Sequence, residues 1–164
     1  MFKKLAISIA ILGVSGSALA GHTNNVLEAS LDGRQEVSNT TNNRISGDPN
    51  GRGEAYVFGI DGDPSTLCYV ITVDKIQLVP VGEGMAAHIH KGEAGSNGPV
   101  VAVLAGPEDG NAADCLTEGL ESSKFPAGPV VQEILTHPED YYINVHNPDF
   151  PAGAIRGQLM QQGN

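Results

Sequence analysis

The feature that most constrains the fold is a series of short apolar runs, each bounded by glycine, proline or asparagine turns. No window longer than about ten residues keeps a convincing helical period. Runs of this kind, rich in β-branched and aromatic residues, are typical of antiparallel strands. The sequence therefore predicts an all-β single domain, an antiparallel sandwich or barrel. The runs are NNVLEASLDG (24–33), GRGEAYVFGID (51–61), LCYVITVDKIQLVP (67–80), MAAHIH (85–90), GPVVAVLAG (98–106), YYINVHN (141–147) and GAIRGQLMQ (153–161).

Helical character is confined to the segment 107–142. We expect short helical turns around Asp114 to Leu120 and around Val130 to Thr136, the second ended by His137-Pro138. The polar stretch 38–53, SNTTNNRISGDPNGRG, predicts an exposed loop or a long hairpin connection. No linker divides the chain.

The N-terminus has the three parts of a secretory signal peptide: Lys3 and Lys4, an apolar core, and small residues ending at Ala20. The apolar core is shorter than the ~20 residues that span a bilayer, which disfavours a membrane anchor. We expect residues 1–20 to be removed, leaving a secreted or periplasmic chain of residues 21–164 with no membrane insertion.

The net charge of the chain is −10, and removal of Lys3 and Lys4 makes the remainder more acidic. Such a surface repels nucleic acid, which we do not expect as a partner. The two cysteines, Cys68 and Cys115, lie in the exported part, where a disulfide is favoured over a cysteine metal site. It would close a loop of roughly 48 residues and contribute about 4 kcal/mol.

Histidines supply the candidate site. His88 and His90 alternate with Ile89, so on a strand both imidazoles point to one face, and Asn144 and His146 do the same later in the chain. Three neutral imidazoles suit copper or zinc better than calcium or magnesium. The alternative is that His88 and His90 are half-buried sheet residues bonded to backbone carbonyls or to an acid such as Glu93. His22 near the expected new N-terminus could also bind copper, and His137 is a cap or turn residue.

Other chemistries find little support. No GxSxG motif follows the signal peptide, and no glycine-rich loop opens a helix after a strand. A pair of carboxylates acting as in a glycosidase is not excluded, because a chain with 19 acidic residues brings some of them together by chance. No catalytic residue is assigned.

Three blocks, LEASLDGRQEV, AHIHKGEAGSNGPVVAVL and YYINVHNPDFPAGAIRGQL, resemble in order and spacing the signature blocks of the CHRD domain. The resemblance covers about residues 26–160 and implies an immunoglobulin-like or superoxide-dismutase-like Greek-key sandwich. One departure is Ala154, where the family usually carries Glu, and the cysteines lie outside the pattern. The family pattern marks Glu36, His88, His90, Gly92, Gly95, Gly98, Pro99, Asn144, His146, Gly153, Ile155, Arg156, Gly157, Gln158 and Leu159.

The resemblance leaves three functions open. The first is a binding module that holds copper or zinc through His88, His90 and His146, with an unidentified protein partner as the other possible ligand. The second is a structural or adhesive interaction module without metal. The third is a dismutase-like redox enzyme in which Arg156 guides an anion, although the chain lacks the further histidines and the aspartate run needed for that enzyme's bridging ligand and separate zinc site. Against that role, we expect Arg156 in a buried ion pair with Glu36.

Overall fold

A computed structural model describes residues 26–38 and 46–163, so the expected signal peptide lies outside it. The described residues form nine strands, one α-helix and three short 3-10 turns. The strands are β1 (Val26–Asp32), β2 (Arg52–Ile60), β3 (Asp63–Asp74), β4 (Ala86–Lys91), β5 (Val100–Leu104), β6 (Asn111–Thr117), β7 (Tyr141–His146), β8 (Ile155–Gln158) and β9 (Met160–Gln161). The helix is α1 (Val131–Thr136), and the 3-10 turns are η1 (Gly33–Gln35), η2 (Ser122–Lys124) and η3 (Pro138–Asp140). No helix among these is long and apolar enough to cross a membrane.

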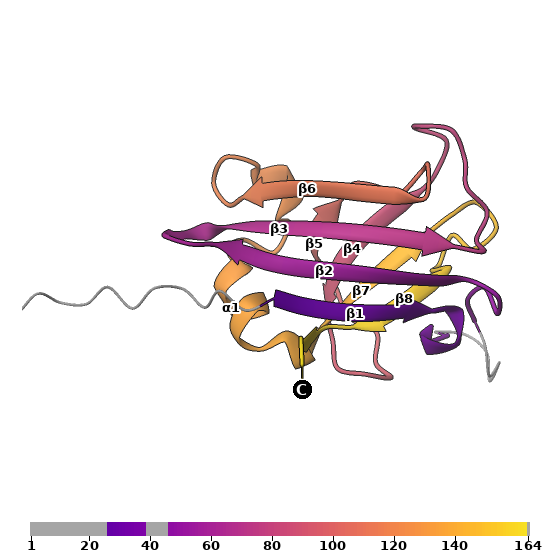
Figure 1. The fold of residues 1–164 in the computed structure, drawn as a ribbon, viewed down its shortest axis with the longest axis horizontal. Helices are drawn as coiled ribbons and strands as arrows, with labels where there is room; N and C mark the ends of the chain where they lie inside the picture. The colour runs from indigo at the N-terminus through magenta and orange to yellow at the C-terminus, as the bar shows by residue number, and fades with distance from the viewer. Residues whose placement is uncertain (1–25, 39–45, 164) are drawn as a thin grey trace, which may run out of the picture.

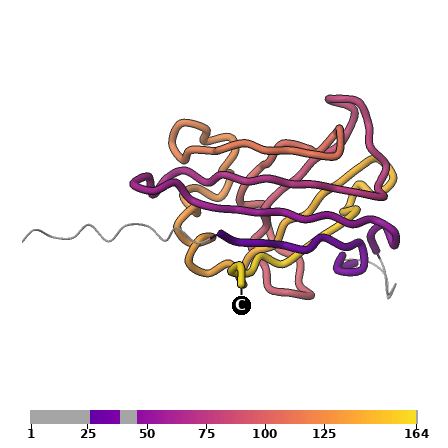
Figure 2. Tube along the Cα trace, viewed as in Figure 1, coloured from indigo at the N-terminus to yellow at the C-terminus, as the bar shows by residue number. Residues whose placement is uncertain are grey.

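The strands lie in two layers. Hydrogen bonds connect them in the order β5-β4-β7-β8-β1-β2-β3-β6, with β9 also paired to β1, and every pairing is antiparallel. Figure 1 shows β6, β3, β2 and β1 as one layer, with β5, β4, β7 and β8 crossing behind it. Between β8 and β1 one residue pair, Asp32 and Arg156, continues the ladder. The chain crosses between the layers after β3, β5 and β6 (Figure 2). The all-β single-domain prediction is confirmed.

Alternation along the strands builds the core between the layers. In β3 the side chains of Leu67, Tyr69, Ile71 and Val73 are buried on one face, and Val70 on the other face is 40 % exposed. In the second layer Ile89 of β4 is fully buried in the same apolar cluster. The second layer therefore presents its other, polar face outward.

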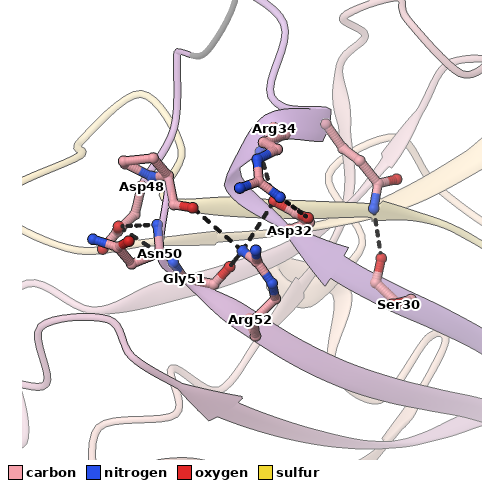
Figure 3. A network of polar contacts seen from close by, with 9 residues as sticks. Ser30, Asp32, Arg34, Asp48, Asn50, Gly51 and Arg52 are labelled. Carbon is pink, nitrogen blue, oxygen red and sulfur yellow. Dashed lines mark hydrogen bonds and ion pairs between the residues drawn. The ribbon is translucent and has the colours of Figure 1, made fainter.

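A polar network fixes the start of β2 against the end of β1 (Figure 3). The carboxylate of Asp32 accepts from the backbone N–H of Arg34 and from the guanidinium of Arg52, at 2.9 and 3.2 Å. Asp48 accepts from the backbone N–H groups of Asn50 and Gly51 and so closes the turn before β2. These contacts hold the segment that carries Glu36 near the end of the second layer.

Two local predictions need correction. The segment expected to turn helically around Asp114 to Leu120 contains the second half of β6, whose outward residues are polar or small. The 38–53 stretch lies in the connection of the antiparallel pair β1 and β2, as the hairpin alternative predicts. It is not wholly exposed, because Gly47 and Gly51 are buried and Arg52 begins β2; residues 39–45 lie outside the description. The second helical prediction is confirmed by α1, with His137 as its C-cap.

Candidate metal centre

Strand register brings the predicted histidines together. In the β4–β7 ladder His88 pairs with Asn144, His90 with Tyr142, and His146 with Ala86. Directly paired residues point to the same side of a sheet, so these polar side chains share one face. The ladder continues into β8, where Arg156 pairs with Asn144 and Gln158 with Tyr142. We call this surface the histidine face; it consists of His88, His90, Tyr142, Asn144, His146, Arg156 and Gln158.

The three imidazoles form a compact cluster. The ring centroid of His88 lies 5.7 Å from that of His90 and 5.1 Å from that of His146, and the last two are 6.4 Å apart. One ring nitrogen from each residue lies within 4.8 Å of the other two. Spacing of this order places all three nitrogens around one point, which a single ion could occupy.

Backbone carbonyls set which nitrogen faces that point. Nδ1 of His90 lies 2.9 Å from the carbonyl oxygen of Gly98, and Nδ1 of His146 lies 3.2 Å from that of Pro151. A carbonyl only accepts, so each Nδ1 carries the proton and each Nε2 keeps its lone pair. Both Nε2 atoms, and Nδ1 of His88, are buried without a hydrogen-bond partner among the described residues.

The cluster favours neutral imidazoles. Burial, with smaller contributions from the neighbouring His146 and His90, lowers the pKa of His88 to about 4. Burial also lowers the pKa of His90 and of His146, although the Gly98 and Pro151 carbonyls oppose the shift. Neutral imidazole is the form that binds a metal ion, so protons compete weakly for this cluster near neutral pH.

Arg156 and Tyr142 support the cluster from one side. The ring of Tyr142 stacks on His90, with centroids 4.8 Å apart and planes within 9°, and the Arg156 guanidinium lies 3.4 Å over the same tyrosine ring. Arg156 donates to the carbonyl oxygens of Glu93 and Ser96 and to Oδ1 of Asn97. It is 2 % exposed, so it holds the 93–97 loop over the histidine face.

The expected Arg156–Glu36 ion pair is not present within 4.0 Å among the salt bridges of the described residues. Glu36 instead lies against Asn144, whose Nδ2 donates to its Oε2 at 3.4 Å. Burial raises the pKa of Glu36 to about 7, opposed by the charge of Arg156 and by the Asn144 hydrogen bond. A Cβ on Gly153 would stand 2.5 Å from the same carboxylate, which explains why a glycine is needed there.

The remaining family positions hold the backbone around the cluster. The side-chain nitrogen of Gln158, Nε2, lies within hydrogen-bond distance of the backbone carbonyl oxygens of Gly92, Glu139 and Tyr141. The carbonyl oxygen of Pro99 accepts from the backbone N–H of Lys91. A Cβ on Gly157 would stand 2.5 Å from the carbonyl oxygen of Ser30 across the β8–β1 junction.

Other predicted residues lie apart from the histidine face. Cys68 and Cys115 form a disulfide between β3 and β6, which confirms the predicted pairing and places it in the other layer. Ala154, at the position of the family's usual Glu, is fully buried and its carbonyl accepts from the backbone N–H of Asp48. His22 lies outside the described residues.

Sequence reasoning missed Tyr142 and the Pro151 carbonyl. Tyr142 sits two residues before Asn144, so strand alternation places it on the same face as Asn144 and His146, and that signal was available. The Pro151 contact depends on how the turn after β7 packs, for which the sequence carries no comparable signal.

Comparison with known proteins agrees with this geometry. A family model for the CHRD domain matches residues 27–159. The chain belongs to the CHRD domain family. No curated protein and no solved structure matches the chain. The family match supports a CHRD-type binding module, and this module carries a cluster of three histidines on the outer side of one layer.

Proposed function

We propose that this chain is an exported CHRD-domain module that binds one copper or zinc ion through His88, His90 and His146. Two observations carry the proposal: one ring nitrogen from each of the three histidines lies within 4.8 Å of the other two, and each ring has a buried nitrogen without a hydrogen-bond partner among the described residues. A buried polar atom without a partner is unfavourable, and a metal ion would satisfy all three atoms at once.

The ligand types favour copper or zinc. Imidazole nitrogen suits both ions, whereas calcium and magnesium require oxygen ligands. The carbonyls of Gly98 and Pro151 would act as outer partners that orient two of the ligands, as is usual for metal-binding histidines.

The test is metal uptake by protein purified without a tag after expression of the whole chain, with its N-terminus read by mass spectrometry. Elemental analysis and calorimetric titration with Cu(I), Cu(II) and Zn(II) should give one equivalent of bound metal. The variant His88→Ala/His90→Ala should lose that equivalent. An N-terminus other than Gly21 would contradict the predicted signal cleavage without touching the metal proposal.

Two matched controls separate this site from the other histidines. His137→Ala changes the exposed C-cap of α1 and should leave uptake unaltered. His22→Ala removes the histidine near the expected N-terminus, so copper lost in that variant would belong to the terminus. Unchanged uptake in the His88→Ala/His90→Ala variant would refute the three-histidine site.

The alternative is a structural or adhesive module in which the histidines only brace loops. The hydrogen bonds of His90 and His146 to backbone carbonyls favour it. It predicts that His88→Ala/His90→Ala lowers the melting temperature while metal content stays the same. The dismutase-like function gains no support from Arg156, whose guanidinium is buried against the 93–97 loop and Tyr142 rather than presented to an anion.

A further inference from the structure

The charge around the histidine cluster bears on which ion the cluster could hold. All three ligands are neutral imidazoles, and no carboxylate of the described residues joins the cluster. Residues 1–25, 39–45 and 164, which lie outside the description, contain no aspartate or glutamate at all. No acidic side chain of the chain is therefore available as a direct ligand.

A buried positive charge lies beside the histidine cluster. Arg156 lies over Tyr142, which stacks on the ligand His90. No carboxylate lies within 4.0 Å of that guanidinium among the described ion pairs. Glu36 is the one buried acid of the described residues, and burial raises its pKa to about 7, so it is only partly ionised at neutral pH.

An ion entering this site would gain little compensating negative charge. The cost of moving an ion out of water grows with the square of its charge, and its repulsion by Arg156 grows in proportion to that charge. A divalent ion is therefore penalised more strongly than a monovalent ion in the same three-nitrogen site. Among the ions that imidazole binds, monovalent copper is the one with the lower charge.

We propose that the three-histidine site selects Cu(I) over both Cu(II) and Zn(II), because its ligands are neutral and the Arg156 cation is buried beside them, over the tyrosine ring that stacks on His90. This inference rests on the metal site proposed above and specifies which ion that site holds. The module would accordingly keep copper in the reduced state in an exported, oxidising setting.

The test is competition against chelators of known affinity at one pH, with Cu(I) measured under anaerobic conditions. We expect the dissociation constant for Cu(I) to be at least 100-fold lower than those for Cu(II) and Zn(II). Equal or tighter binding of either divalent ion would overturn the inference and leave the metal site intact. Binding of no ion, or binding unaffected by His88→Ala/His90→Ala, would overturn both proposals.

Two charge variants test the cause. Asn144→Asp adds an acid to the histidine face and should tighten Cu(II) and Zn(II) more than Cu(I), which reduces the preference at least tenfold. Asn111→Asp makes the same change at an exposed position of β6 in the other layer and should leave the preference unchanged.

Glu36→Gln gives the opposite change without altering side-chain shape. It should weaken divalent binding more than Cu(I) binding and so widen the preference, with Glu54→Gln on the exposed face of β2 as the matched control. If neither Asn144→Asp nor Glu36→Gln changes the ratio while both variants melt like the parent, charge does not set the preference and the inference is wrong.

Discussion

At the scale of single residues, the folded chain binds a proton on Glu36 more tightly than the unfolded chain does. Burial raises the pKa of Glu36 from 4.5 to about 7, so its contribution to stability is fully present below pH 4.5 and is lost as the pH rises through 7. Relative to Glu36→Gln, the metal-free parent should lose on the order of 2–3 kcal/mol of unfolding free energy between these values.

Urea denaturation of both proteins at pH 5 and pH 8 measures this difference. The sign is diagnostic, because an acid held ionised by Arg156 would instead lose stability as the pH falls. A parent that gains stability over Glu36→Gln with rising pH would show that Arg156 outweighs burial.

At the scale of elements, the loop between β4 and β5 determines the orientation of His90. The carbonyl oxygen of Gly98 accepts from Nδ1 of His90, and the backbone N–H of Gly98 donates to the hydroxyl of Tyr142 at 3.2 Å. A Cβ on Gly98 would overlap the backbone carbonyl of Lys91, so the loop must move if any other residue stands there. Gly98→Ala should therefore cost more than about 3 kcal/mol and weaken metal binding.

Gly95→Ala, in the same loop, is the matched control. Gly95 has φ of +80°, and no other atom lies within 4 Å of the position that a Cβ would take there, so the cost is backbone strain alone, about 1–2 kcal/mol. Urea denaturation and metal titration of both variants decide the point. An equal loss of unfolding free energy in the two variants would mean that the close contact at Gly98 is relieved without moving His90.

The strands could be predicted where burial leaves an alternating pattern. The runs that include β3 and β7 carry apolar residues on their inward positions, so period and β-propensity agree. β6 gives no such signal, since it lies at the end of its layer and Leu116 is its one buried residue. Its sequence, NAADCLT, is therefore recognisable as a strand only through its pairing with β3.

The histidine cluster could also be predicted from alternation along the strands. Alternation placed His88, His90, Asn144 and His146 on shared faces, and the β4–β7 register then joined the two pairs. The partners of Arg156 were not predictable, because they are mainly carbonyls of the folded 93–97 loop. Sequence patterns identify side chains, whereas the backbone groups that meet them depend on the tertiary arrangement.

At the scale of the whole molecule, the two layers share a core but carry different stabilising features on their outer sides. The disulfide joins β3 to β6 in one layer, and the histidine face belongs to β4, β7 and β8 in the other. Cys68→Ala/Cys115→Ala should lower the unfolding free energy by about 2–4 kcal/mol, since the unfolded chain is no longer constrained. Because the disulfide and the histidine face lie in different layers, the same variant should keep, below its melting temperature, the metal affinity proposed for the histidine face.

Urea denaturation gives the first quantity and calorimetric titration the second, with the reduced parent protein as the control for loss of the cross-link alone. Reduced parent and variant should agree in stability, because both lack the bond while their strand pairings are the same. A variant that folds but binds metal at least tenfold more weakly would mean that packing across the core transmits strain from β3 to β4. In that case the histidine face would depend on both layers, and the disulfide would belong to the support of the metal centre.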